Sequence, residues 1–249
     1  MIELQNTIVV IPARLAATRL PGKPLADIWG EPMIVHVWRR AVEAKVGHVL
    51  VAAGDLPIAE AVRKAGGDAM VTEPNLPSGS DRVAAVLALR DPQQRYTHIV
   101  NLQGDLPTID PLAVQRCLAG LTNESVDIST IAAEIHDAED VAKSQIVKAI
   151  APLGPDREVA FARDFVRQVN GSHEPPFWHH IGVYAYRREA LQRFVTLPQS
   201  PREKERSLEQ MRALDNGMKI AVVRVDSVPL GVDTPADLEA ARIALKDRK

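Results

Sequence analysis

Short apolar runs alternate along the chain with segments of helical period, and this alternation restricts the fold more than any other feature. The runs have the length and the β-branched content of strands. They are TIVVIP (7–12), HVLVAA (48–53), DAMVT (68–72), THIVNL (97–102), VDISTIAAEI (126–135), QIVKAI (145–150), HIGVYAY (180–186) and IAVVRV (220–225). Because strands that alternate with helices form sheets covered on both faces, the sequence predicts an α/β fold with a mostly parallel mixed sheet.

Helical periodicity is clearest in the first half of the chain. Residues 33–42 place apolar side chains at the positions i, i+1, i+4 and i+5 of one helix face, and Gly47 follows as an end signal. A second helix is predicted over residues 57–65, just before a pair of glycines. A third is predicted to begin with Ser80 or Asp81 as its N-cap.

The last helix has the sharpest predicted start. Thr234 is a suitable N-cap, Pro235 fits the first helical position, and Asp237 completes a variant of the capping box. The sequence therefore predicts a helix that begins at Pro235.

Length and charge set the broad class of the protein. The chain has 249 residues and no Ser/Gly-rich linker or charge block, so we predict one domain over residues 1–249. With 30 Lys and Arg residues against 32 Asp and Glu residues, the formal net charge is -2, which argues against a nucleic-acid binder. Any site for an anion must therefore be local.

Neither a targeting signal nor a membrane segment is evident. The N-terminus MIELQNT is unlike a secretory signal, and no uncharged apolar run approaches the roughly 18 residues of a membrane span. We therefore expect a cytoplasmic protein that has no membrane partner. Cys117, the single cysteine, lies in an apolar helical pattern, which favours a reduced core thiol over a catalytic nucleophile.

A basic stretch, IPARLAATRLPGKPL (11–25), follows the first predicted strand. It carries Arg14, Arg19 and Lys23 and no acidic residue. Open α/β sheets bind ligands at the carboxyl ends of their strands, which is where this stretch begins. A solvated surface loop is the other reading of the same residues. The fragment PGKP lacks the spacing and the hydroxyl of a P-loop, so ordinary ATPase chemistry is not expected.

Two aspartates complete the pattern. Asp105 follows the strand THIVNL, and Asp233 follows the strand IAVVRV and precedes the last helix. If both strands belong to one parallel sheet, both carboxylates reach the edge where the basic stretch lies. Each aspartate alone could be a turn or capping residue. Together with three cations they suit Mg²⁺ and a triphosphate, because Mg²⁺ takes one or two carboxylates plus phosphate oxygens.

Six blocks of the chain resemble, in order and approximate spacing, the 3-deoxy-manno-octulosonate cytidylyltransferase family, the CMP-Kdo synthetases of lipopolysaccharide assembly. They are IPARLAATRLPGKPL, SGSDR (78–82), NLQGDLPTI (101–109), HHIGVYAYRR (179–188), SLEQMRALDNG (207–217) and GVDTPADLE (231–239). The resemblance implies a three-layer α/β/α fold of the nucleotide-diphospho-sugar transferase type, usually as a homodimer. It also implies transfer of CMP from CTP to the anomeric hydroxyl of Kdo, with Mg²⁺ and release of pyrophosphate.

The same resemblance implies roles for individual residues. The nucleotide-binding residues would be Arg14, Arg19, Lys23, Ser78 and Asp105, and the catalytic set would be Arg14, Lys23, Asp105 and Asp233. Asp105 and Asp233 would hold Mg²⁺. The sugar-binding residues would be Gln103, Arg163, His180, Tyr184, Glu209 and Gln210. On residue chemistry alone, a solvated helix face, an exposed arginine and a structural strand histidine remain alternatives for several of these sugar-binding residues.

Several positions depart from the commonest form of the family. Leu106 stands where many members have Glu, residues 51–58 (VAAGDLPI) stand where Ala-Thr-Asp-Asp is usual, and Arg206 stands where an acidic residue is usual. The phosphate and metal residues are intact, so the acceptor is the open question. A related acid such as 8-amino-Kdo or a sialic-type acid is the alternative acceptor. A nucleotide-binding protein without turnover is the alternative from another functional class.

Overall fold

The computed structural model describes residues 2–16, 19–171 and 173–246 of the chain. The chain packs into two compact units: a terminal unit, Glu3–Gln115 with Pro229–Lys249, and a central unit, Arg116–Val228 with Met1–Ile2. The single domain over residues 1–249 stays a prediction. In the part of the chain that the structure describes, no helix is both long enough and apolar enough to cross a bilayer.

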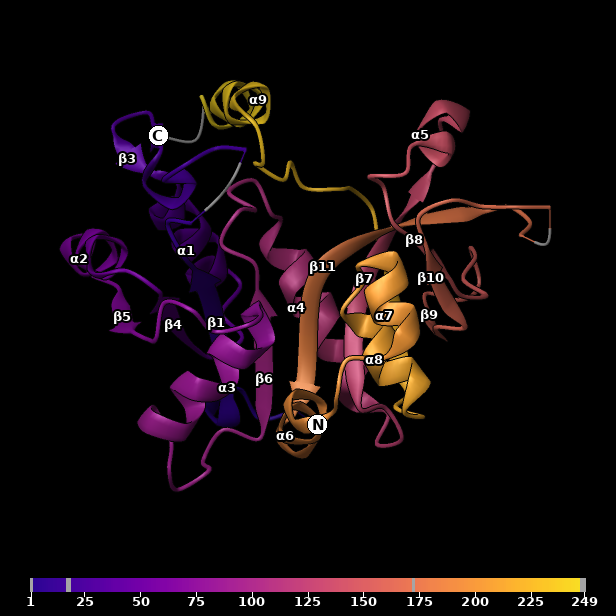
Figure 1. Cartoon of the computed structure of the whole chain (residues 1–249), viewed down its shortest axis with the longest axis horizontal. Helices are drawn as coiled ribbons and strands as arrows, with labels where there is room; N and C mark the ends of the chain where they lie inside the picture. Colours follow the sequence, from indigo (N-terminus) through magenta and orange to yellow (C-terminus); the bar gives the residue numbers. More distant parts are fainter. Residues whose placement is uncertain (1, 17–18, 172, 247–249) are drawn as a thin grey trace. The chain divides into compact units, whose positions relative to one another are not determined.

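Four parallel strands form the core of the terminal unit (Figure 1). They lie in the order β5 (Asp68–Val71), β4 (His48–Ala53), β1 (Thr7–Ala13) and β6 (His98–Leu102). Every residue of β1 is buried, as expected for a strand whose two faces are both covered. These strands coincide with four of the predicted apolar runs, so those predictions are confirmed.

Helices and a short hairpin complete the terminal unit. They are η1 (Leu4–Asn6), η2 (Lys23–Leu25), β2 (Asp27–Ile28), β3 (Glu31–Pro32), α1 (Met33–Glu43), α2 (Leu56–Lys64), α3 (Gly79–Arg90), α4 (Pro111–Ala119), which runs past the division after Gln115, and α9 (Pro235–Leu245). On the apolar face of α1, Met33, Ile34, Val37 and Ala41 are buried, whereas Trp38 is half-buried and Val42 is 45% exposed. The three predicted helices α1, α2 and α9 are therefore confirmed, whereas the β2–β3 hairpin has no strong sequence signal.

The predicted start of the third helix is wrong by two or three residues. The N-cap of α3 is Ser78, not Ser80 or Asp81, and its backbone is extended. The Ser78 hydroxyl accepts a hydrogen bond from the Asp81 amide at 3.1 Å and donates one to the Asp81 carboxylate at 2.7 Å. The residues Ser78 and Asp81 thus form a local cap that satisfies a backbone donor of the first turn, and Asp81 takes a place inside the helix.

The strands of the central unit pair in both parallel and antiparallel directions. Its strands are β7 (Ile128–Ile135), β8 (Lys148–Ile150), β9 (Val159–Phe161), β10 (Asp164–Val166), β11 (Phe177–Arg187) and β12 (Ile220–Val225). β12 runs parallel to β7, and the pairs β11–β7, β11–β8, β8–β10 and β12–β9 are antiparallel. Its helices are η3 (Gly120–Thr122), α5 (Ala138–Ala142), α6 (Arg188–Thr196), α7 (Pro201–Arg206) and α8 (Gln210–Asp215).

Cys117 lies in the core of the central unit. Its Sγ is 3.6 Å from the carbonyl oxygens of Ser129 and Val183, and its side chain is fully buried. Burial raises the pKa of the thiol to about 12, so the reactive thiolate is scarce at neutral pH. The prediction of a core thiol is confirmed.

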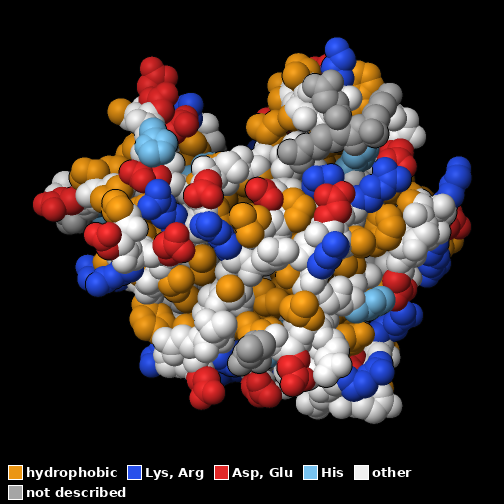
Figure 2. Space-filling model, turned by 180° about the vertical axis from the view of Figure 1, so that it is seen from behind, with side chains coloured by type: hydrophobic (Ala, Val, Ile, Leu, Met, Phe, Trp, Pro, Cys, Tyr) orange, Lys and Arg blue, Asp and Glu red, His pale blue; other side chains and the backbone are white. Residues whose placement is uncertain are grey.

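Charged side chains of both signs share the surface. Figure 2 shows Lys and Arg side chains interspersed with Asp and Glu side chains on one face of the molecule. This distribution agrees with the net charge of -2 and gives that face no continuous basic track for a nucleic-acid backbone.

Candidate active site

The carboxyl ends of the parallel strands in the terminal unit form one edge, and a cavity of about 370 Å³ opens there. The register pairs Ala13 with Ala53 and Ala53 with Val71, so β1, β4 and β5 end together. All of the predicted site residues in this unit line the cavity: Arg14, Arg19, Lys23, Ser78, Gln103, Asp105 and Asp233. Their roles remain predictions, but the chain brings all of them to one place where α/β sheets bind ligands.

The loop that carries the cations is held by its backbone. The Leu15 amide donates to Asp55 Oδ2 at 2.7 Å, and the Gly22 amide donates to the Leu15 carbonyl oxygen at 3.2 Å. Gly22 has φ +70°, a conformation that glycine adopts without strain. Residues 17–18 of the basic stretch lie outside the described residues. Both described ends of the loop are thus fixed, which sets the starting points of the cationic side chains.

Asp105 reaches the cavity because Gly104 allows a close approach to β1. A Cβ atom at Gly104 would lie 2.9 Å from the Pro12 carbonyl oxygen, which is closer than real Cβ atoms come to backbone. Val232 also donates its amide to the Asp105 carbonyl oxygen at 2.9 Å. A larger residue at position 104 would therefore displace the Asp105 carboxylate.

The ammonium of Lys23 lies between the two predicted metal ligands. Its Nζ donates to Asp105 Oδ2 at 2.9 Å, to Asp233 Oδ1 at 3.0 Å and to the Val232 carbonyl oxygen at 3.0 Å. Burial by itself lowers the pKa of Lys23, but the charges and hydrogen bonds of Asp105 and Asp233 outweigh it, so the net pKa is raised. Lys23 is therefore a charged group that draws both carboxylates to a single point.

Asp233 receives a second cation from Arg19. Arg19 Nη2 lies 2.9 Å from Asp233 Oδ2, and the two side chains are 66% and 48% exposed. An ion pair this exposed contributes little to stability, because water screens it. The pair matters because it places the Arg19 guanidinium beside the cavity, where it can reorient to bind a phosphate group.

Asp233 takes its position from the start of α9 and not directly from the end of β12. β12 ends at Val225 in the central unit, whereas Asp233 belongs to the terminal unit. The start of α9 positions Asp233 instead: Thr234 is the N-cap, and the side chain of Asp237 accepts the amides of Asp233 and Thr234 at 3.1 and 2.8 Å. The capping box predicted for this helix is confirmed, and it also orients the residue before the cap.

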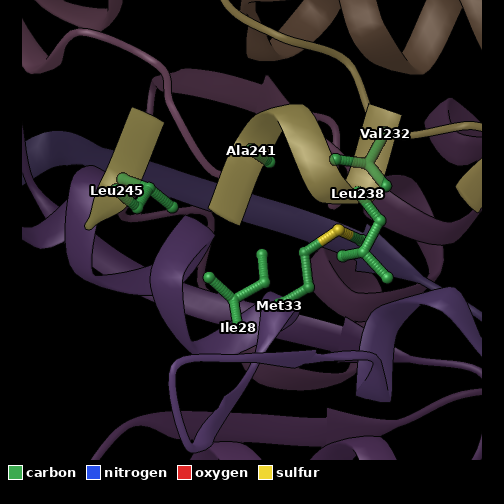
Figure 3. Packing of buried hydrophobic residues seen from close by; sticks show 6 residues of the cluster. All are labelled: Ile28, Met33, Val232, Leu238, Ala241 and Leu245. Atoms are coloured by element: carbon green, nitrogen blue, oxygen red, sulfur yellow. The ribbon is translucent and has the colours of Figure 1, made fainter. Parts of the chain in front are cut away.

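An apolar cluster fixes α9 on the elements that follow the basic loop. Figure 3 shows Met33 of α1 and Ile28 of β2 packed against Val232, Leu238, Ala241 and Leu245. Leu20 and Ala26, on either side of Lys23, are partly buried against the same cluster. The hydrophobic contacts that hold α9 in place therefore also hold the backbone of the Lys23 segment close to Asp233.

Arg82 also lines the cavity, although it is not among the site residues predicted from the sequence. It is only 3% exposed, and its guanidinium donates to the side chain of Thr72, to the Glu73 carbonyl oxygen at 2.8 Å and to the Pro74 carbonyl oxygen at 3.0 Å. Burial and the nearby Arg14 lower its pKa. Arg82 thus holds the loop after β5 at the cavity wall, and its place in the SGSDR block is the sequence signal that could have identified it.

The predicted sugar-binding residues lie in both units. Gln103 lines the cavity of the terminal unit and donates from Nε2 to Asn101 Oδ1 at 3.1 Å. The others, Arg163, His180, Tyr184, Glu209 and Gln210, belong to the central unit. Arg163 is exposed and lies between β9 and β10.

Tyr184, Glu209 and Gln210 line one hollow in the central unit. The hollow has about 10 Å³ of free volume, close to that of one water molecule. Gln210 is 6% exposed, and its Nε2 has no hydrogen-bond partner among the residues that the structure describes. A buried amide donor without a partner costs free energy unless a ligand or water pairs with it, so this group suits a hydroxyl-rich ligand. Burial raises the pKa of Tyr184, which therefore stays protonated and can donate.

His180 is part of the core of the central unit. Its Nε2 lies 3.0 Å from Thr130 Oγ1, and its ring meets Phe165 edge-on at a centroid distance of 4.9 Å. Burial, with a smaller contribution from His179, lowers the pKa of His180 to about 3. The imidazole is thus neutral at physiological pH and unsuited to act as a general acid there.

We expect His180 to make stability fall as the pH is lowered. The folded protein holds a neutral imidazole, whereas the unfolded chain takes up a proton near pH 6.5, so acid favours unfolding between about pH 6.5 and pH 3. From pH 7 to pH 5, urea unfolding should show the wild type losing about 2 kcal/mol more than His180→Gln. Replacement of the exposed His136 by Gln is the control. Equal losses in wild type and His180→Gln would show that His180 is protonated in the folded state.

The corner before α8 is held by a buried ion pair. Arg212 Nε and Nη2 donate to the two carboxylate oxygens of Glu203 at 2.9 and 2.6 Å, and both side chains are less than a tenth exposed. Ser207, between α7 and α8, has φ 53°. The pair ties α7 to α8 and so orients Glu209, the N-cap of α8, and Gln210, the first residue of α8.

Comparison with known proteins agrees with this arrangement. The sequence model of the cytidylyltransferase family, described as "Cytidylyltransferase", matches residues 8–220. A 3-deoxy-manno-octulosonate cytidylyltransferase of Parvibaculum lavamentivorans is 57% identical over 98% of this chain and 94% of the relative. The enzyme of the same name from Paramagnetospirillum magneticum is 52% identical over 99% of this chain and 100% of the relative.

A solved structure gives the same assignment. The structure of a CMP:2-keto-3-deoxy-manno-octonic acid synthetase complexed with CTP superposes with a TM-score of 0.87 and 36% sequence identity. The match covers 98% of this chain and 99% of that chain. The predicted α/β fold of the nucleotide-diphospho-sugar transferase type and the predicted nucleotidyltransferase class are confirmed. The chain belongs to the 3-deoxy-manno-octulosonate cytidylyltransferase family.

Proposed function

We propose that this protein transfers CMP from CTP to the anomeric hydroxyl of Kdo, with release of pyrophosphate, for lipopolysaccharide biosynthesis. The observation that carries the proposal is the cavity of the terminal unit, where Arg14, Arg19 and Lys23 meet two carboxylates at the carboxyl edge of a parallel sheet. The cations suit the charge of a triphosphate and of the pyrophosphate that leaves. Relatives more than half identical over nearly the whole chain bear the name of this activity.

The chain's residues fit a magnesium ion. Asp105 Oδ2 and Asp233 Oδ1 converge on one cationic group at 2.9 and 3.0 Å, which places two hard oxygen ligands around a common point. The described residues contain no group of three or more His, Cys, Asp or Glu side chains that could hold a metal alone. This suits Mg²⁺, which takes one or two carboxylates and completes its shell with phosphate oxygens and water. When bound there, the ion would polarise the phosphoryl group under attack and neutralise developing charge.

The reaction is an in-line displacement at the α-phosphorus of CTP. The anomeric oxygen of the sugar forms a bond to that phosphorus, the bond to the β-phosphate bridging oxygen breaks, pyrophosphate takes the electron pair, and the hydroxyl proton passes to solvent. Arg14, Arg19 and Lys23 would hold the β- and γ-phosphates and stabilise the leaving charge. With His180 neutral and buried, positioning and electrostatics supply most of the rate enhancement.

The proposed sugar-binding residues offer the polar groups that a sugar acid needs. In the central unit, the Gln210 Nε2, which has no hydrogen-bond partner among the described residues, and the protonated Tyr184 hydroxyl can each pair with a hydroxyl or carboxylate. In the terminal unit, Gln103 offers an amide at the nucleotide cavity. Arg163, Glu209 and His180 remain further proposed contacts. Because a site built for such hydrogen bonds rejects ligands that leave its groups unpaired, acceptor choice should be strict.

The activity is tested by pyrophosphate release from purified protein with Mg²⁺. Kdo, 8-amino-Kdo and N-acetylneuraminate are offered as acceptors with CTP, and ATP, GTP and UTP serve as nucleotide controls. We expect rapid release with CTP and Kdo alone. Release confined to another acid would move the function to that acceptor, and no release with any pair would favour a nucleotide-binding protein without turnover.

We further propose a cytoplasmic homodimer, as the family resemblance implies. Light scattering coupled to size exclusion gives the molar mass directly. A mass of about twice the 27.2 kDa of one chain would support the dimer, and a mass equal to one chain would contradict it.

A further inference from the structure

The three donors of the Lys23 ammonium are all in use. An ammonium carries three N–H donors. Those of Lys23 match three acceptors, Asp105 Oδ2, Asp233 Oδ1 and the Val232 carbonyl oxygen, at 2.9 to 3.0 Å. In this position Lys23 has no donor left for a phosphate oxygen, although phosphate binding is the role that the proposed function gives it.

The same two carboxylate oxygens are the proposed magnesium ligands. A magnesium ion binds oxygen at about 2.0–2.1 Å and carries twice the charge of an ammonium. The ammonium and the ion would compete for oxygens that already converge on one point, and their like charges repel at such short range. Lys23 and a divalent cation therefore exclude each other from the point between Asp105 and Asp233.

The cavity leaves room for a second position of the Lys23 side chain. Its backbone is fixed, since it begins η2 after the left-handed Gly22 and lies between the anchored residues Leu20 and Ala26. The side chain lines the 370 Å³ cavity and is 16% exposed, and it is a flexible four-carbon stem. It can thus leave the carboxylates by a change of rotamer and stay inside the same cavity.

We propose that Lys23 is an exchangeable counter-ion that occupies the point between Asp105 and Asp233 and moves to the phosphates of the nucleotide when a divalent cation takes its place. This rests on the proposed function, because it assumes that the two carboxylates bind the metal. The exchange makes the binding of metal and nucleotide mutually favourable: the metal frees the ammonium for phosphate, and phosphate draws the ammonium off the metal ligands. Lys23 then weakens metal binding until the nucleotide is present.

The experiment measures Mn²⁺ binding to the protein without nucleotide, from the electron paramagnetic resonance signal of free Mn²⁺. We expect Lys23→Met and Lys23→Gln to bind Mn²⁺ at least about tenfold more tightly than wild type, because the competitor is gone. Arg14→Met is the matched control: it removes the same charge from the same cavity, while the carboxylates keep their bonds to Lys23 and Arg19. It should raise the affinity less than about threefold. Thermal melts confirm that each variant is folded.

Two different failures can be told apart. Equal Mn²⁺ affinity in wild type, Lys23→Met and Lys23→Gln, or an equal gain in Arg14→Met, would overturn the exchange while leaving the metal site in place. Absence of Mn²⁺ binding in wild type and in Lys23→Met, with and without CTP, would overturn the proposed metal site itself and the exchange with it. Adding Asp105→Asn to Lys23→Met should abolish the gain, which ties it to this carboxylate.

Discussion

Replacement of Asp105 by Asn should lower kcat with CTP and Kdo by about a thousandfold while the protein stays folded. The change keeps the size of the side chain but removes the charge that one proposed metal ligand supplies. Loss of a single preorganised group that stabilises transition-state charge typically costs about 10²–10³-fold, and a metal ligand supports several such contacts at once. Steady-state pyrophosphate release across a range of Mg²⁺ concentrations gives kcat and the Mg²⁺ requirement together.

The control for this prediction is Asp226→Asn, which removes the same charge from a side chain that is 77% exposed. It should leave kcat within about twofold of wild type. Asp233→Asn should behave as Asp105→Asn does, because the two carboxylates share the same cationic partner. Near-normal turnover in both the Asp105 and the Asp233 variants would contradict the proposal that these two carboxylates bind the metal.

Breaking the Glu203–Arg212 pair should destabilise the protein more than any other substitution proposed for the central unit. Glu203→Gln leaves a buried guanidinium without its counter-charge, and loss of one partner of a buried pair costs about 3–5 kcal/mol. Gln can still act in the capping box with Ser200, so the change isolates the charge. Urea unfolding of the whole chain measures the free energy of unfolding.

The control is Glu239→Gln, which breaks an exposed i,i+3 pair with Arg242 and should cost less than about 0.5 kcal/mol. The double variant Glu203→Gln with Arg212→Met should recover part of the loss, because no charge is then left buried. The KM for Kdo should rise in Glu203→Gln while the KM for CTP holds, since the pair orients Glu209 and Gln210. An equal loss of unfolding free energy in Glu203→Gln and Glu239→Gln would show that the buried pair stabilises the fold no more than an exposed pair does.

The elements of the fold were predictable where one local signal dominates. The apolar runs gave the strands because a parallel sheet covered on both faces has no solvent side to interrupt them, as β1 illustrates. The start of α9 was predictable because Thr234, Pro235 and Asp237 act within one turn. The start of α3 was misjudged because three of the four residues 78–81 are polar, and Ser78, Ser80 and Asp81 could each serve as a cap. Only the observed hydrogen bonds select Ser78.

The candidate site was predictable in part. That Arg14 and Asp105 share one edge follows from the direction of parallel strands, so it could be derived from the sequence. That Asp233 joins them was predicted from its place after a strand, but the apolar cluster that fixes its position could not be, because segments far apart in the chain, such as Met33 and Leu238, form it. The bonds of Lys23 to both carboxylates, and the burial of Arg82, likewise depend on tertiary packing. The sugar-binding residues rested on family resemblance, since no local pattern marks them.

The most direct test of the account is a crystal structure of the protein with CTP and Mg²⁺. We expect the triphosphate in the cavity of the terminal unit, with Arg14, Arg19 and Lys23 on the β- and γ-phosphates and a metal ion bound by Asp105 and Asp233. The Lys23 ammonium should have left the two carboxylates for the phosphates. A nucleotide bound away from this cavity, or one bound there with no metal at Asp105 and Asp233, would contradict the account.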